Sequence, residues 1–262
     1  MILVKDIEVT DKFGLEFLHV EFRIQDTHEN LDNYIFDVYK SYHQTEGFEL
    51  IQSDIKDFYV LDYDVNLYDN SKNYYYKIKV IDKNSGKELF SDVLGEYRSA
   101  DTDCESQGIL EIHKKYLSCV VKQKMILLKR KRNGQLCECY DDVRKRANPT
   151  NCYECYGTNY VGGYYTPYVV DVNFANVSGK REGFDYTEVG EEENPLQLWT
   201  NNYPFIQIGD ILIDRNNTRY IVMTCQPSYK NFFLLRQTVQ VSRVPKSNVV
   251  YSVAVDPNIK LY

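Results

Sequence analysis

Short segments in which apolar and polar residues alternate with a period of two constrain this chain more than any other feature. This period places every second side chain on the same face of a β-strand. Within the first 100 residues, turn-forming sequences such as 45–47 and 83–86 separate the runs 17–24, 34–39, 58–63 and 74–81. We therefore expect residues 1–100 to form a β-sandwich.

The last third of the chain has the same character. A strand is predicted at 168–174, and further strands at 204–214, 218–223 and 232–241 fit a small barrel or a curled antiparallel sheet. Residues 176–202 are polar, include Glu191 to Glu193, and are expected to form a long loop. The 24 Tyr against three Met and one Trp also favour β-structure over a helix bundle.

Residues 104–123 change period and predict a helix. Apolar side chains recur there at intervals of three and four, at Ile109, Ile112, Tyr116, Leu117, Val120 and Val121. Asp101 or Asp103 is a candidate cap at its start. The helix is expected to pack within its own chain; the alternative is a stem that packs against neighbouring subunits. A short strand at 125–128 should follow.

The predicted fold is therefore mainly β and divides into four parts. These are a sandwich at 1–100, a linking helix and strand at 101–128, a metal-binding insertion at 129–167 and a C-terminal β domain at 168–262. We find no internal repeat and no low-complexity tract.

Charge and hydropathy limit the classes of function. The formal net charge of −7 argues against a general nucleic-acid binder, whose affinity comes from Lys and Arg facing phosphates. The N-terminal residues lack a signal-peptide pattern, and no apolar run approaches the roughly 20 residues that span a bilayer. We expect folding in the cytosol and no membrane partner, so the seven Cys point to metal binding or free thiols before disulfides.

The strongest chemical signal is a group of four cysteines within nineteen residues. Two short pairs, separated by twelve residues, supply the four soft ligands that tetrahedral zinc prefers. Gly157 follows the second pair where such a turn needs a positive φ, and Asn159 is the next residue type best suited to that conformation. We predict a structural zinc ion bound by Cys137, Cys139, Cys152 and Cys155.

The first cysteine pair leaves an alternative open. Its one-residue gap is tighter than the usual two to four, so one member of the pair need not be a ligand and Asp141 would then complete the shell. Four free or disulfide-bonded thiols are the other alternative. None of the four His lies in this segment, which favours a structural over a catalytic ion, because catalytic zinc keeps an open position.

A basic cluster surrounds the cysteines. Seven positive residues against three acidic ones leave a net charge of +4 across residues 129–146. The functional interpretation is contact with DNA or with an acidic neighbouring subunit, and the alternative is a solvated strand edge that resists aggregation. The positive residues are Lys129, Arg130, Lys131, Arg132, Arg144, Lys145 and Arg146.

Catalytic motifs are missing from the sequence, so we predict a protein that is not an enzyme. It contains no G-x-S-x-G, P-loop, H-E-x-x-H or G-x-G-x-x-G pattern. Asp62, Asp64 and Asp69 offer oxygen ligands for Ca²⁺, but they lack the fixed spacing and central Gly of a calcium loop.

Three resemblances extend these expectations. Residues 38–41, 47–51, 59–65, 74–80 and 86–92 follow the order of a fibronectin type III domain, whose members usually bind or act as spacers. Residues 155–158 resemble one unit of the zinc repeat of DnaJ-type chaperones. The chain is also similar to virion proteins of tailed bacteriophages. This resemblance is carried by the sandwich, the basic strand, the cysteine pairs, the run 155–167 and the segments 209–213 and 219–222.

The phage resemblance implies a structural role in the neck or head–tail connector. A homo-oligomeric ring, portal, adaptor or tail proteins as partners, and a place in the virion after assembly in the host cytoplasm would follow from it. One alternative is a baseplate or tail-fibre attachment protein, in which the sandwich is an adhesive spacer. A zinc-dependent hydrolase is the alternative from another class, and it requires an open ligand position at Cys137 or Cys139.

Overall fold

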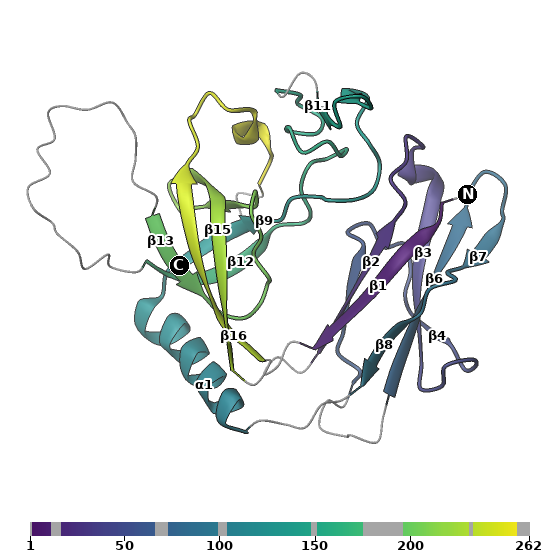
Figure 1. The fold of residues 1–262 in the computed structure, drawn as a ribbon, viewed down its shortest axis with the longest axis horizontal. Helices are drawn as coiled ribbons and strands as arrows, with labels where there is room; N and C mark the ends of the chain where they lie inside the picture. The colour runs from purple at the N-terminus through teal and green to yellow at the C-terminus, as the bar shows by residue number, and fades with distance from the viewer. Residues whose placement is uncertain are drawn as a thin grey trace, which may run out of the picture. The chain divides into compact units, whose positions relative to one another are not determined.

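The computed structural model describes residues 2–11, 17–65, 73–98, 104–147, 151–174, 196–230 and 233–255. The fold is mainly β, as predicted (Figure 1). The chain divides into two compact units, one made of residues 1–103 and 131–163 and the other of residues 104–130 and 164–262. The cysteine segment therefore belongs to the same unit as the N-terminal strands.

The first unit contains two antiparallel sheets. One has the strand order β1 (Val4–Asp11), β2 (Leu18–Ile24) and β5 (Tyr59–Asp62). The other has the order β4 (Glu49–Gln52), β3 (Tyr34–Ser41), β6 (Asn73–Asp82) and β7 (Glu88–Phe90), and β8 (Gly95–Arg98) also pairs with β6. A short 3₁₀ helix, η1 (Leu31–Asn33), precedes β3.

Aromatic side chains join these two sheets into the predicted sandwich. The rings of Phe22 on β2 and Phe36 on β3 lie 5.7 Å apart, and Phe58 stands edge-on to both at 5.5 and 5.7 Å. Offset and edge-to-face contacts of this kind add about 1 kcal/mol each beyond the area they bury. The alternation seen in the sequence thus places one side chain in every two in a shared core.

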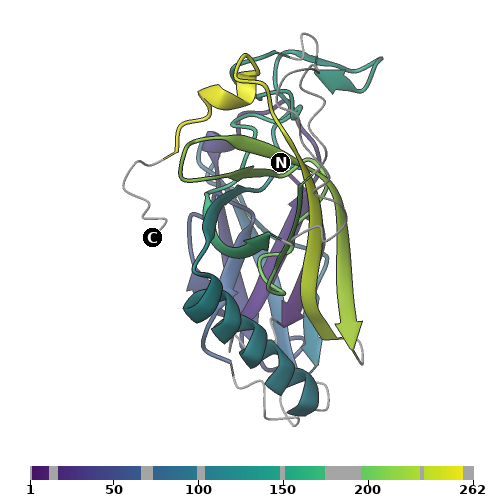
Figure 2. The same ribbon diagram turned by 90° about the vertical axis from the view of Figure 1, so that its left-hand side faces the viewer.

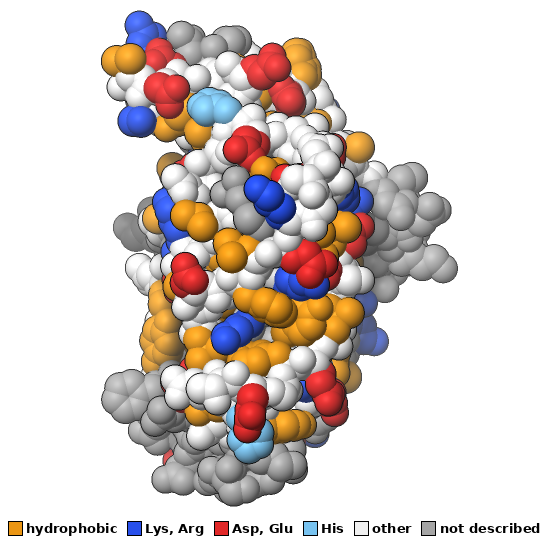
Figure 3. Space-filling model, turned by 90° about the vertical axis from the view of Figure 1, so that its right-hand side faces the viewer, with side chains coloured by type: hydrophobic (Ala, Val, Ile, Leu, Met, Phe, Trp, Pro, Cys, Tyr) orange, Lys and Arg blue, Asp and Glu red, His pale blue; other side chains and the backbone are white. Residues whose placement is uncertain are grey.

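The outer face of the second sheet carries aromatic and lysine side chains on adjacent strands. Tyr39 and Phe90 lie 5.2 Å apart, and the ammonium groups of Lys77 and Lys79 stand over the rings of Phe48 and Phe90. Figure 3 shows hydrophobic side chains interleaved with Lys and Arg on this side of the molecule. Cross-strand and cation–π contacts let a solvent-facing sheet keep large apolar rings.

The second unit contains a closed six-stranded barrel, one of the two C-terminal arrangements that were predicted. The barrel also includes the strand Lys124–Leu128, which was assigned to the linking segment 101–128 and not to the C-terminal domain. The strands follow one another around it in the order β12 (Tyr168–Phe174), β13 (Leu196–Thr200), β16 (Phe233–Arg243), β15 (Arg219–Lys230), β14 (Ile211–Ile213) and β9 (Lys124–Leu128). Its core is formed by Met125, Leu127, Val170, Val172, Leu198, Ile206, Leu212, Val222, Val239 and Val241.

Two strand predictions in this unit were wrong. Residues 196–200, which were assigned to the long loop 176–202, form β13 and close the barrel between β12 and β16. The predicted strand 204–214 is reduced to Ile211–Ile213, because Pro204 lacks an N–H and the Ile206 N–H bonds to the side chain of Gln237. Glu191 to Glu193 lie outside the described residues.

The predicted helix is confirmed as α1 (Cys104–Lys115), and it continues into a π-helical turn, η2 (Tyr116–Val121). α1 packs against β16 and η2 against β12 (Figure 2). The predicted apolar face was only partly right. Leu117 is buried as expected, whereas Ile112 and Val120 are 66% and 67% exposed. The candidate caps at 101 and 103 lie outside the described residues.

A buried arginine ties the end of the described chain to the barrel. Arg219, at the start of β15, donates to the backbone oxygens of Val250 and Val253 and packs on the ring of Tyr251. These bonds hold the 3₁₀ helix η3 (Val249–Ser252) in place. None of the helices in the described parts of the chain has the length and apolar character needed to cross a lipid bilayer.

Gln237 is a buried polar residue on β16 that holds the segment 201–206 by hydrogen bonds. It is fully buried, accepts from the Ile206 N–H and donates to the carbonyls of Asn201 and Pro204. Gln237→Leu would leave these backbone groups without partners, at about 1–3 kcal/mol for each buried group left unpaired. We expect a loss of about 3 kcal/mol in urea unfolding. Thr238→Val, which changes a half-buried neighbour on the same strand, should cost far less.

Candidate metal centre

The cysteine segment is held by backbone bonds to one end of the sandwich. Gln135 forms a parallel bridge with Thr27, whose N–H and C=O bond to Gly134 and Leu136. The Gln135 side chain accepts from the Leu31 N–H at 3.2 Å. This docking is part of one compact unit, so the sandwich fixes where the first cysteine pair begins.

Gly134 makes this docking possible. Its φ is +118°, and a Cβ placed there would lie 3.1 Å from the Phe58 ring. The backbone can approach the aromatic core of the sandwich this closely only because the side chain is missing.

A two-stranded hairpin, β10 (Tyr140–Asp141) and β11 (Arg146–Ala147), links the two cysteine pairs. The Asp141 carboxylate accepts from the N–H groups of Val143 and Arg144 and lies 3.6 Å from the Arg144 guanidinium. This side chain therefore caps the hairpin turn. The alternative in which Asp141 completes the metal shell is not what the structure shows: the group that it brings together consists of cysteines alone.

The second pair sits in a tight turn of the kind predicted. The Tyr156 N–H bonds to Cys152 O at 2.8 Å, and the Thr158 N–H bonds to Cys155 O at 2.9 Å. Gly157 and Asn159 have φ values of +77° and +83°, which confirms the left-handed conformation expected for both. Gly163, which was not singled out, packs so closely that a Cβ on it would lie 2.8 Å from Cys155 O.

The four sulfurs converge on one point. All four Sγ atoms lie within 4.8 Å of one another, with Cys137 to Cys152 at 3.7 Å and Cys139 to Cys155 at 3.5 Å. Zn–S bonds of about 2.3 Å place the sulfurs of a tetrahedral site about 3.8 Å apart, whereas a disulfide requires about 2.0 Å. The separations therefore fit four ligands of one metal ion, and the one-residue gap of the first pair does not keep either member out.

Burial protects this group. Cys137 and Cys155 are fully buried, and the cluster around them contains Ala147 and Val161 as its apolar members besides the four cysteines. Such a small apolar core contributes little folding free energy by itself. A bound metal ion would supply the folding free energy that this small core lacks.

The pKa values of the thiols differ across the cluster. Burial raises the pKa of Cys137, and it raises that of Cys139 to about 12. Burial also acts to raise the pKa of Cys152, but the N–H groups of Cys155 and Glu154 and the neighbouring thiols outweigh it and lower this pKa to about 7. Cys152 thus supplies a thiolate near neutral pH, which is the form that binds metal.

Glu154 is a neighbour that sequence reasoning did not identify. Its Oε2 accepts from the Cys137 thiol at 3.2 Å, while the side chain is exposed to solvent. The single residue between Tyr153 and Cys155 gave no signal of this contact, because it depends on how the two cysteine pairs are brought together. A carboxylate here adds negative charge beside the sulfurs.

Asn159 offers a direct test of the turn. Its side-chain oxygen accepts from the Ala147 N–H at 2.8 Å while its backbone is left-handed. Asn159→Ala would lose this bond, about 1 kcal/mol, and place a Cβ residue in a conformation that costs about a further 1–2 kcal/mol. We expect a thermal unfolding midpoint several degrees lower for residues 131–163. Asn159→Gly should recover most of the backbone part of that loss.

The basic cluster is divided between the two units. Lys129 and Arg130 belong to the barrel unit, where the Lys129 ammonium bonds to Phe205 O and lies 3.7 Å from Asp210. Lys131 belongs to the sandwich unit and donates to Val161 O at 3.0 Å; burial lowers its pKa. Both lysines thus support the chain internally, while Arg132, Arg144, Lys145 and Arg146 are exposed.

The candidate calcium ligands have a different role. Asp62 and Asp64 surround the ammonium group of Lys40, which occupies the position that a cation would take. Asp69 lies outside the described residues. The sequence signal that could have revealed this is Lys40 itself, a charged residue at an inward position of the alternating strand 34–41.

No family model and no curated protein sequence matches this chain.

Proposed function

We propose that this chain is a non-catalytic structural protein of a tailed-phage particle, part of the neck or head–tail connector, in which the four cysteines hold one structural zinc ion. The observation that carries the non-catalytic part is the closed set of four sulfurs. A tetrahedral ion bound by all four has no vacant position for water or substrate. A hydrolase would need such a position.

Zinc is the ion that this donor set suits best. Four thiolates in a tetrahedron are soft ligands typical of zinc, with iron the main competitor. A site of this type closes the hairpin 140–147 and the turn 152–157 onto the end of the sandwich. Its role would be to hold one surface in shape, since the apolar core of this segment is small.

The sequence resemblance supports the phage assignment. Residues 211–213 and 219–222, which carry part of that resemblance, lie in β14 and β15 of the closed barrel. Small barrels of this kind are what the resemblance implies for ring-forming neck proteins. The two-sheet sandwich is equally suited to a spacer in a baseplate or tail fibre, which makes that position the second candidate.

Ring assembly would need surface contacts between copies of the chain. Ile112 on α1 and Val120 on η2 are each about two-thirds exposed, in line with the alternative that this helix packs against neighbouring subunits. The exposed Arg144, Lys145 and Arg146 on the β10–β11 hairpin would face an acidic neighbour or DNA. Heterologous contacts that close on themselves generate rings.

The experiment combines sedimentation with localisation. We expect the purified chain to sediment as a ring, alone or with portal, adaptor or tail proteins, and a label on it to mark the neck of the particle. Ile112→Asp with Val120→Asp should keep the fold and abolish assembly, whereas Lys114→Asp on the same helix should retain it. A label at the baseplate or fibres would select the second candidate. A monomer that never assembles and cleaves test substrates would contradict both.

A further inference from the structure

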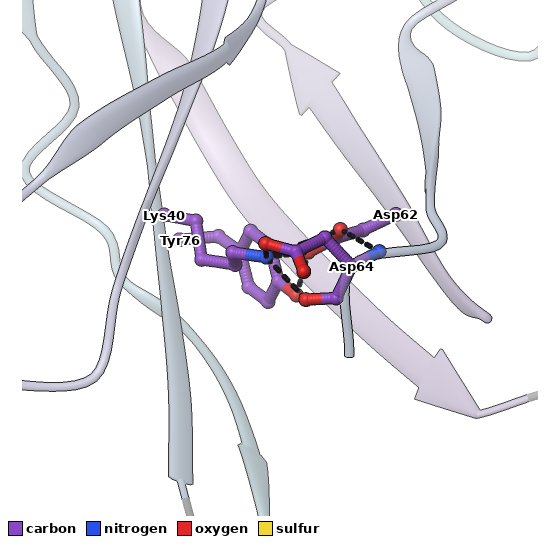
Figure 4. A network of polar contacts seen from close by, with 4 residues as sticks. All are labelled: Lys40, Asp62, Asp64 and Tyr76. Atoms are coloured by element: carbon purple, nitrogen blue, oxygen red, sulfur yellow. Dashed lines mark hydrogen bonds and ion pairs between the residues drawn. The ribbon is translucent and has the colours of Figure 1, made fainter. Parts of the chain in front are cut away.

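A buried lysine–aspartate pair crosses the core of the sandwich (Figure 4). Lys40 follows Phe36 and Val38 at the inward positions of β3, and Asp62 follows Val60 at the inward positions of β5. β3 and β5 belong to different sheets, so the two side chains meet between them. They are 7% and 3% exposed. The positions that elsewhere hold apolar residues here hold an ammonium and a carboxylate.

The reacting atoms of this pair are close. Lys40 Nζ lies 3.2 Å from Oδ1 and 3.0 Å from Oδ2 of Asp62, so it is nearly equidistant from the two carboxylate oxygens. Reacting atoms held about 3–3.5 Å apart gain a large effective concentration over free amine and acid in water. Attack on Cγ requires the carboxylate to rotate about the Cβ–Cγ bond, so that its face turns toward the nitrogen.

Two further groups complete the arrangement. Tyr76 stands opposite Lys40 in the β3–β6 register, and its hydroxyl donates to Asp62 Oδ2 at 2.8 Å. Asp64 accepts from Lys40 Nζ through its backbone oxygen at 2.6 Å and its carboxylate at 3.2 Å. The Asp64 side chain is 92% exposed. A hydrogen-bond donor thus faces the carboxyl oxygen, and a proton acceptor connects the amine with solvent.

We propose that Lys40 and Asp62 condense into an intramolecular isopeptide bond that links the two sheets. The Nζ–Cγ bond forms and one Cγ–O bond of Asp62 breaks. The departing oxygen leaves as water with two of the three Nζ protons, and the third stays on the amide nitrogen. The positive and negative charges of the pair cancel, so the step needs no oxidant, reductant or co-reactant.

The residues around the pair divide the work of this reaction. Asp64 takes a proton from Nζ, which frees the lone pair for attack, and passes it toward the departing oxygen. Tyr76 stabilises the negative charge that develops on the Asp62 oxygen. Burial supplies the driving force, because a neutral amide replaces two charges whose removal from water is costly.

A persistent ion pair is the competing state. Burial lowers the pKa of Lys40, but the hydrogen bonds and charges of Asp62 and Asp64 outweigh it and raise this pKa overall. The protonated amine is not a nucleophile, so condensation is expected to be slow compared with folding. The folded protein should therefore be sampled over several days.

Intact mass under denaturing conditions tests the bond. We expect the folded chain of 30.9 kDa to become lighter by the mass of one water, whereas Lys40→Arg and Asp62→Ala keep their full mass. Trypsin should fail to cut after Lys40 and should yield residues 24–56 joined to residues 57–72. Wild-type protein that keeps its full mass would overturn the proposal. Loss of water with trypsin still cutting after Lys40 would also overturn it, because the water would then come from another site. Both results are read from the wild-type chain, so they hold even if a variant fails to fold.

The assigned role of Asp64 has its own test. Asp64→Asn should slow the loss of water at least about tenfold, since positioned proton transfer contributes about 10²–10⁴-fold to a rate. Glu88→Gln, which removes an exposed carboxylate that pairs with Lys79 in the same unit, should leave the rate unchanged. Equal rates for Asp64→Asn and the wild type would remove Asp64 from the reaction.

Discussion

Cys155→Ser is expected to abolish metal retention and to unfold residues 131–163 while the barrel stays folded. Cys155 is fully buried, its Sγ lies 3.5 Å from that of Cys139, and the cluster has little other apolar core. Structural zinc contributes on the order of 10 kcal/mol of apparent binding free energy near pH 7, so losing one of four ligands removes several kcal/mol. Metal content and hydrogen exchange by mass spectrometry measure the two effects.

Cys119→Ser is the matched control. Cys119 is an exposed free thiol on η2 in the barrel unit, far along the chain from the cluster. It should keep its metal and its pattern of hydrogen exchange. If Cys155→Ser retains a full equivalent of metal and normal protection across 131–163, the four-cysteine site is wrong.

Asp210→Ala is expected to destabilise the barrel by about 3–5 kcal/mol. Asp210 is fully buried, accepts from the N–H groups of Arg130 and Gln207 at 3.0 and 2.9 Å, and lies 3.7 Å from the ammonium of Lys129. Its removal leaves two backbone donors and a mostly buried lysine without their acceptor. Urea unfolding followed by the fluorescence of Trp199, the single Trp of the chain, reports on this unit.

Asp214→Ala is the control that separates the effect of burial from the effect of the number of hydrogen bonds lost. The Asp214 carboxylate also accepts from two backbone N–H groups, those of Asn216 and Thr218, both at 2.8 Å, but in a turn open to solvent. Water can replace its bonds, so we expect a loss of only about 1 kcal/mol. Similar losses for Asp210→Ala and Asp214→Ala would show that the buried charge network contributes nothing of its own.

Much of the fold follows from local patterns. The alternation at 17–24, 34–39, 58–63 and 74–81 predicts β2, β3, β5 and β6 because a sheet with one buried face imposes that period. β13 was missed because it is five residues long and follows a polar stretch, so the alternation at Leu196 and Leu198 is too short to stand out. Its assignment depends on β12 and β16, which lie far away in sequence.

The helix shows a second limit. The periodicity predicts α1 correctly, but the choice of its buried face depends on what covers it. Leu110 and Leu117 are buried, while Ile112 and Val120, which belong to the predicted face, are exposed. A helix that packs on one sheet needs fewer apolar positions than this sequence provides, and the sequence alone does not say which of them remain at the surface.

The grouping of the four cysteines was predictable because it depends on local spacing. The cysteine spacing predicts the four ligands, and Gly157 and Asn159 predict the left-handed turn after the second pair. The docking through Thr27 and the contact of Glu154 with Cys137 were not predictable, since they depend on the relation of distant segments. The inward position of Lys40 signals that this lysine needs a buried partner, but the identity of that partner, Asp62, was not predictable, because the pair forms only once two sheets face each other.

Elemental analysis combined with X-ray absorption at the zinc edge tests most directly whether the four cysteines form a closed structural zinc site. We expect one zinc per chain, surrounded by four sulfur atoms at about 2.3 Å, with no lighter ligand in the shell. A protein purified without reductant or chelator that contains no metal, or whose metal binds oxygen or nitrogen at a fourth position, would contradict it.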